Sequence, residues 1–197
     1  MAADAERREA AILYAELRNF AKLSEVLAPA TVLELANDFF SLAGMAVTAN
    51  GGKVLSVQND MLLAAFAKAE RKEYAPRALK SARDLSREFA AMADEWKAKH
   101  GIPAAVSSAL HIGEAVYGMA GPIGARQFVA FGECVSIAER LVQRARAGEV
   151  ILSRDFMQAL GPAAQSLGAE ELPALELPKR APIAIYGLAL EKRLDFQ

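Results

Sequence analysis

The sequence predicts an α+β domain with a ferredoxin-like βαββαβ core and C-terminal additions. Two observations carry this prediction. Short apolar runs alternate with stretches of helical periodicity in the order β-α-β-β-α-β, and the helical stretches are long enough to cover one face of a sheet. The chain has 197 residues, of which 53% are hydrophobic and 24% are charged. We therefore expect one domain with a hydrophobic core, because the chain is short for two.

A buried strand and a helix are expected first. Residues 10–16 are a short apolar run that ends in a carboxylate, which is typical of a buried strand. Apolar side chains then recur at helical spacing from Pro29, a residue suited to a first helical turn, until the turn-forming residues 50–52. A helix is expected between these two points.

A hairpin and the longest helix are expected next. Two apolar runs, residues 53–57 and 61–66, are separated by three polar residues, so Asp60 is predicted at the tip of a hairpin. From about residue 70 to residue 99, one apolar stripe at helical spacing predicts the longest helix. The glycine and proline at positions 101 and 103 end that pattern.

The remaining chain is expected to hold strands, one helix and a proline-rich loop. Residues 105–112 and 114–117 form a pair of strand candidates, and residues 127–131 are a further one. An apolar face over residues 135–145 predicts a helix. Late strands are expected at residues 149–153 and 183–190, separated by a loop that contains Pro173, Pro178 and Pro182.

Charge and cysteine content restrict the partners and the compartment. The formal net charge is -1 and the chain has no basic block, so neither nucleic acid nor an anionic membrane is an expected partner. Cys134 is the single cysteine, which excludes an internal disulfide and favours a reducing, cytoplasmic setting. The first ten residues lack the apolar core of a signal peptide, and we expect no membrane-spanning segment.

Four segments, in the same order, resemble motifs of the class III adenylyl and guanylyl cyclases. Residues 13–25, LYAELRNFAKLSE, resemble FADIRGFTxLSE, and residues 51–66, GGKVLSVQNDMLLAAF, resemble the metal-binding hairpin GGxxxKxxGDxxxAxF. Residues 109–118, ALHIGEAVYG, resemble GIHTGEVVVG, and residues 126–141, RQFVAFGECVSIAERL, resemble RxxYTVIGDTVNxAARL. The segment LPKRAPIAIYGL fits the family's tail.

The resemblance covers roughly residues 10–190 and implies a class III cyclase homology domain. We place this domain at residues 11–190, after an N-terminal extension of residues 1–10 and before a tail of residues 191–197. In the family, an arm at the position of residues 118–124 helps two subunits embrace. A homodimer is therefore expected, or a heterodimer with another cyclase domain.

The resemblance also implies a site for Mg²⁺ or Mn²⁺ at Glu16 and Asp60. In the family, two carboxylates hold two metal ions that activate the ribose 3′-hydroxyl and bind the triphosphate. Asp60 fits the motif, although Asn59 replaces the usual glycine. Glu16 is one methylene longer than the usual aspartate, which moves its oxygens by about 1.5 Å and weakens the fit to octahedral Mg²⁺. The alternative is that both residues are a strand end and a hairpin tip facing water.

Three further matched positions have lost the family's chemistry. The purine-reading pair, a lysine and an aspartate or threonine, is replaced by Ser56 and Val129, which offer one hydroxyl and no polar group respectively. The two transition-state groups, an asparagine and an arginine four residues later on one helix face, are here Ser136 and Arg140. The arginine is kept, whereas Ser136 is too short to act without a bridging water.

These losses predict a catalytically impaired signalling or regulatory dimerisation module that retains weak nucleotide or metal binding. An alternative stays open: an active, unconventional adenylyl or guanylyl cyclase that makes cyclic AMP or cyclic GMP from ATP or GTP at the dimer interface. Class III sites lie between subunits, so a partner could supply the missing groups. A third reading, without the resemblance, is an α+β ligand-binding domain.

Overall fold

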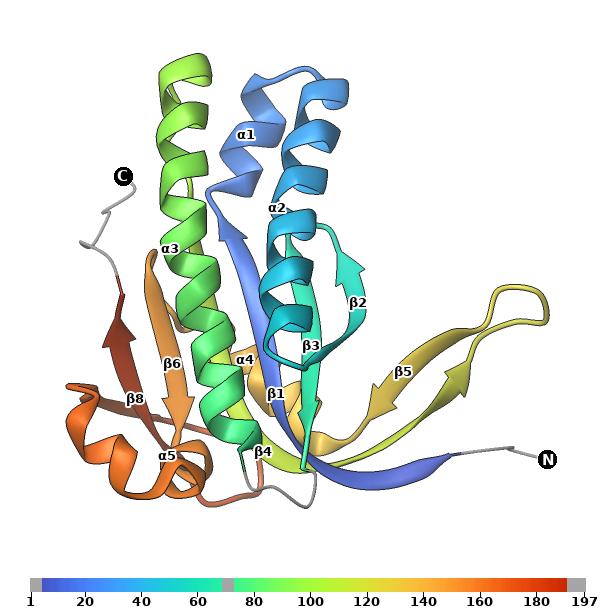
Figure 1. Cartoon of the computed structure of the whole chain (residues 1–197), viewed down its shortest axis with the longest axis vertical. Helices are drawn as coiled ribbons and strands as arrows, with labels where there is room; N and C mark the ends of the chain where they lie inside the picture. The colour runs from blue at the N-terminus through green and yellow to red at the C-terminus, as the bar shows by residue number, and fades with distance from the viewer. Residues whose placement is uncertain (1–4, 69–72, 191–197) are drawn as a thin grey trace.

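The sheet is built around a long central strand, β1 (Glu6–Arg18), shown in blue in Figure 1. The computed structural model describes residues 5–68 and 73–190. β1 pairs antiparallel with β3 (Met61–Ala67) on one side and with β4 (Ala105–Ala120) on the other. This strand is longer than the predicted residues 10–16, because pairing with β4 continues beyond the apolar run at both ends.

The predicted ferredoxin-like core is confirmed by the strand order. β2 (Lys53–Gln58) lies next to β3, and the order β2-β3-β1-β4 is antiparallel throughout. C-terminal strands extend this sheet beyond β4 in the order β6-β8-β7, with β6 parallel to β4. These strands are β6 (Glu149–Ser153), β7 (Glu170–Leu175) and β8 (Ile183–Ala189), while β5 (Gln127–Phe131) pairs with β4 outside this path.

Helices cover both faces of the sheet. α2 (Pro29–Ala49) and α3 (Tyr74–His100) pack on one face, in front of β1 in Figure 1. α4 (Glu133–Val142) packs on the other face against β1 and β4. The shorter helices are α1 (Phe20–Val26), α5 (Arg154–Leu160) and the 3₁₀ helix η1 (Gly161–Ser166). The hairpin of β4 and β5 extends away from the sheet as an arm (Figure 1).

An aromatic cluster joins α2 to α3. Phe89 of α3 is completely buried, and its ring centroid lies 6.0 Å from that of Phe39 and 5.3 Å from that of Trp96. Both ring pairs meet at nearly right angles, 87° and 88°, the edge-to-face geometry that aromatic quadrupoles favour. The cluster therefore fixes how the two long helices pack.

β4 is one continuous strand where the sequence predicted two. Gly113, between the two predicted segments, continues the ladder by pairing with Ala10. A Cβ atom placed on Gly113 would lie 2.5 Å from the Cβ of Cys134 at the start of α4. The prediction was wrong because this glycine marks a close approach between strand and helix and not a turn.

The predicted proline-rich loop was also wrong in part. The segment between β6 and β8 contains α5, η1 and β7. The Oγ of Ser153 accepts a hydrogen bond from the Phe156 N–H at 3.2 Å and caps α5. Pro173 lies in β7, an edge strand, where a missing N–H is tolerated.

Other helix ends differ from the predictions. α1 was not predicted, and the chain enters it through Asn19, whose φ of 68° is left-handed. α4 spans residues 133–142 and not 135–145. α3 begins at Tyr74; the predicted start near residue 70 lies outside the described residues, as does the predicted tail, residues 191–197.

α2 is long and apolar enough to satisfy length and composition criteria for a membrane span, with a mean hydropathy of 1.2. Core helices of soluble proteins meet the same criteria, so the absence of a membrane-spanning segment stays a prediction. In the fold, the buried side chains of α2 face the main core, including Leu35, Phe39 and Val47. α2 thus acts as a core helix here.

Candidate functional site

Two carboxyl groups come together where β1 ends beside the tip of the β2–β3 hairpin. Glu16 pairs with Met61 in register, and the Leu17 N–H donates to the backbone carbonyl of Asp60 at 2.8 Å. Asn59 forms the turn with a φ of 53°, in the left-handed region that asparagine tolerates. The structure thus brings Glu16 and Asp60 together. Their role as metal ligands stays a prediction.

One oxygen of Glu16 is already paired within the chain. Nη1 of Arg18 donates to Oε1 of Glu16 at 2.8 Å, and the two side chains are only 28% and 17% exposed. The other oxygen, Oε2, is buried and has no hydrogen-bond partner among the described residues. Burial raises the pKa of Glu16; Arg18 opposes this rise and Asp60 adds to it.

Relative to the unaltered chain, Glu16→Gln is expected to be more stabilising at pH 8 than at pH 4. A raised pKa in the folded state means that the folded protein binds this proton more tightly than the unfolded chain. The stability of the unaltered protein therefore falls, relative to Glu16→Gln, as pH rises through the unfolded pKa towards the folded one.

Urea unfolding between pH 4 and pH 8 checks this expectation. Glu34→Gln is the matched control, because Glu34 is exposed on α2 and should not show the effect. A wild-type protein that gains stability relative to Glu16→Gln with rising pH would contradict the assignment.

The two positions predicted to read a purine lie on strands that contact each other. Ser56 is exposed on β2, directly after an irregularity in its pairing with β3. Val129 is half-buried on β5 and pairs with Gly118 of the arm. Together they present one hydroxyl and one isopropyl group, so these two side chains include neither a cation nor a strong acceptor for a base.

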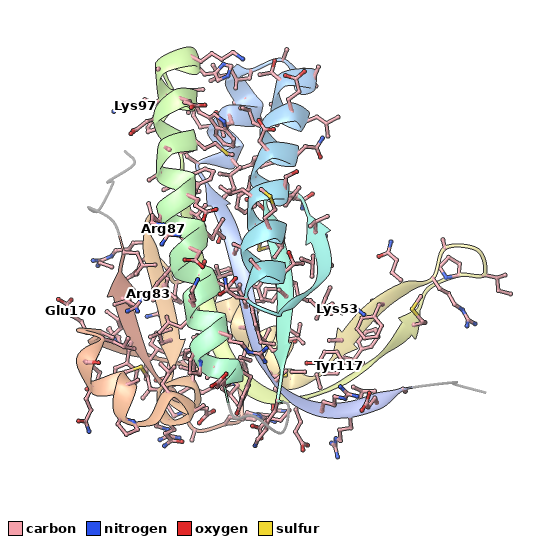
Figure 2. All side chains as sticks on the ribbon, viewed as in Figure 1. Lys53, Arg83, Arg87, Lys97, Tyr117 and Glu170 are labelled. Atoms are coloured by element: carbon pink, nitrogen blue, oxygen red, sulfur yellow. The ribbon has the colours of Figure 1, made fainter. Side chains whose placement is uncertain are left out.

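A lysine that the sequence analysis missed lies close to these positions. Lys53 of β2 places its Nζ 3.5 Å from the ring centroid of Phe128, the residue before Val129. Tyr117 stacks on the same ring with centroids 6.3 Å apart, and Lys53 and Tyr117 line one pocket near the base of the arm (Figure 2). A lysine three residues before Ser56 on the same strand was the available signal.

A second group of predicted residues lies on α4. Ser136 and Arg140 are one helical turn apart and line an open cleft of about 260 Å³. Arg180, from the loop before β8, also lines this cleft and forms an ion pair with Glu133. Neither metal-position carboxylate is among the described residues that line it. A site shared between two subunits, as the resemblance implies, would divide in this way into two half-sites, and that role stays a prediction.

Arg180 was another residue that the sequence analysis did not assign. It lies within the tail segment LPKRAPIAIYGL, where the basic pair of residues 179–180 was the only signal. Its contact with the first turn of α4 depends on how the loop folds back over the sheet, which no local pattern specifies.

Cys134, near the α4 N-terminus, is a buried structural residue. Its Sγ lies 3.3 Å from the backbone carbonyl of Glu114, to which it donates. Burial raises the pKa of the Cys134 thiol despite the nearby backbone amides that lower it. A thiol that is buried and resists deprotonation is unreactive.

The acidic pair does not match the two-metal set that the family motif implies. Within residues 5–68 and 73–190, no group of three or more His, Cys, Asp or Glu side chains could hold a metal ion; a site of only two carboxylates falls below that criterion, so the pairing of Glu16 decides the fit. Arg18 occupies one oxygen of Glu16, which leaves Oε2 and the Asp60 carboxylate. As arranged, these residues do not fit two ions.

Comparison with known proteins agrees with the motifs. Residues 3–189 match the family described as "Adenylate and Guanylate cyclase catalytic domain". No curated protein sequence matches the chain significantly.

Three solved structures illustrate the similarity of the fold. The adenylyl cyclase CyaB from P. aeruginosa has a TM-score of 0.85 at 19% identity, with 98% of this chain and 100% of that chain covered. The guanylyl cyclase Cya2 has a TM-score of 0.83 at 23% identity, with 94% and 93% covered. The guanylate cyclase domain of RhGC from Catenaria anguillulae, solved in complex with GTP, has a TM-score of 0.79 at 17% identity, with 95% and 100% covered. At these identities the likeness concerns the fold.

Proposed function

The chain belongs to the adenylate and guanylate cyclase catalytic domain family, and from that premise we propose that it is a catalytically silent cyclase homology domain acting as a dimerising signalling module. The observation that carries this proposal is the pair of base-reading positions. Ser56 and Val129 lie on contacting strands and offer a base neither a cation nor a carboxylate.

The half-site on α4 supports the same proposal. Ser136 replaces the asparagine that would reach the reacting groups, while Arg140 remains in the cleft. Loss of one aligned donor costs about 10²–10³ in rate in other enzymes, and such losses do not simply add. Together with the paired Glu16, these replacements are expected to reduce turnover severely.

Dimerisation is the second part of the proposal. The arm carries exposed apolar side chains, with Met119 54%, Ile123 98% and Phe131 67% exposed. A partner subunit would cover them and bring the acidic pair of one chain to Arg140 of the other. We propose a homodimer in the cytoplasm, or a heterodimer with another cyclase domain, with at most weak binding of ATP or GTP and of Mg²⁺ or Mn²⁺. Sedimentation equilibrium of the chain alone distinguishes the two assemblies.

The decisive experiment is a cyclase assay. The purified chain is incubated with ATP or GTP and with Mg²⁺ or Mn²⁺, alongside an Asp60→Ala variant as the matched background. We expect no cyclic AMP or cyclic GMP above that background in any of the four combinations. Product that depends on Asp60 would overturn the proposal.

An unconventional active cyclase is the second candidate, and Lys53 is the observation that favours it. Its ammonium group lies beside Phe128, next to one replaced purine position. If product forms in the assay, an active cyclase predicts that Lys53→Met lowers product formation at least about tenfold. Lys22→Met, a change at an exposed residue of α1, should leave product formation unchanged.

A further inference from the structure

We propose that Arg18 is a built-in counter-ion of the acidic pair, which restricts divalent-cation binding by this chain until the arginine is removed. The proposal rests on the proposed function only in placing Glu16 and Asp60 at the metal position. It concerns cation binding itself, which is measurable whether or not any cyclic nucleotide is made.

The geometry of β1 brings Arg18 to Glu16. Residues two apart on a strand project from the same face, and Arg18 reaches back so that its Nη1 lies 2.8 Å from Oε1 of Glu16. The extra methylene of glutamate extends the carboxylate along this face, compared with the aspartate of the family motif. Arg18 matches the arginine of the motif FADIRGFTxLSE, so the longer acid is what differs here, and it brings the carboxylate to the guanidinium.

The surroundings strengthen this pair. The Arg18 and Glu16 side chains are 28% and 17% exposed, whereas Arg8 and Glu6, with the same spacing on the same strand, are 51% and 55% exposed. Two opposite charges that are partly buried away from water attract each other more strongly than two exposed charges. Arg8–Glu6 therefore provides an internal comparison for the effect of burial on the same contact.

Arg18 satisfies only one of the two carboxylate oxygens of Glu16. Oε2 of Glu16 is buried without a hydrogen-bond partner among the described residues, and the negative charge of Asp60 acts on the same carboxyl group. A guanidinium satisfies one oxygen here, whereas a metal ion could bind both carboxylates. Removing Arg18 leaves two unbalanced acids together, the arrangement that attracts a divalent cation.

Direct Mn²⁺ binding tests the proposal, with the free ion followed by electron paramagnetic resonance. The full chain is compared with Arg18→Ala and Arg18→Gln, with Arg8→Ala as the matched control. We expect the unaltered chain and Arg8→Ala to bind Mn²⁺ equally weakly, and both Arg18 variants to bind at least about tenfold more tightly. Adding Asp60→Asn to Arg18→Ala should abolish that gain.

Thermal unfolding of each variant is the folding control. If both Arg18 variants fail to fold, Glu16→Asp takes their place. It moves the acid away from Arg18 and is expected to show the same gain in Mn²⁺ affinity. Folded variants that bind no more tightly than the unaltered chain would refute the proposal, as would a gain that survives Asp60→Asn.

The cyclase assay on the same proteins separates this inference from the proposed function. Tight Mn²⁺ binding by the unaltered chain, without product, refutes the counter-ion and leaves the silent module standing. Product made by Arg18→Ala, with the expected gain in Mn²⁺ affinity, supports the counter-ion and refutes the view that the base-reading positions silence the site.

Discussion

Restoring the four family residues missing from the site is expected to raise cyclase activity at least about 10²-fold over the unaltered chain. We expect this because the chain has the family fold, so the repair has to supply only the missing side chains. The lysine and aspartate would read the base, the asparagine would reach the reacting groups, and the shorter acid would release Arg18. The repaired chain carries Glu16→Asp, Ser56→Lys, Val129→Asp and Ser136→Asn.

Product formation from ATP and GTP with Mn²⁺ measures this repair. The same chain with Asp60→Ala added is the control, and it should return activity to background. Activity that is unchanged in a folded, dimeric repaired chain would mean that the silence arises elsewhere, for example in the spacing of the subunits. If Glu16→Asp alone restored product formation, the loss of activity would instead be assigned to the pair Glu16 and Asp60.

Phe89→Ala is expected to lower the free energy of unfolding by about 3–5 kcal/mol, a large part of the stability of a typical domain. Phe89 is completely buried and makes edge-to-face contacts with Phe39 and Trp96. Its removal leaves a cavity between α2 and α3 that neither of these rings can fill without leaving its own position.

Urea denaturation monitored by circular dichroism measures the Phe89→Ala loss. Leu33→Ala is the control, because Leu33 lies on α2 but is 63% exposed, so its truncation should change stability by less than about 0.5 kcal/mol. Equal losses in the two variants would show that the α2–α3 contact is not a main source of stability.

Local sequence signals were sufficient where structure and chemistry depend on short stretches of chain. The core order β-α-β-β-α-β followed from periodicity and turn residues, and the four motifs alone indicated the family. These local signals failed where the role of a residue depends on contacts with residues far away in the sequence. Gly113 suggested a break because a glycine in a strand resembles a turn, whereas its actual constraint is Cys134, packed against it from α4.

Motifs alone were enough to identify the family and the residues at six matched positions, because each motif specifies which side chains occupy a strand or a helix. The contacts of those side chains follow instead from the tertiary structure. It placed Arg18 on Glu16, Lys53 on the Phe128 ring, and Arg140 in a cleft separate from the two acids. These contacts arise from the direction of side chains on strands and from loops that fold back over the sheet, and both are set by packing between segments far apart in the chain.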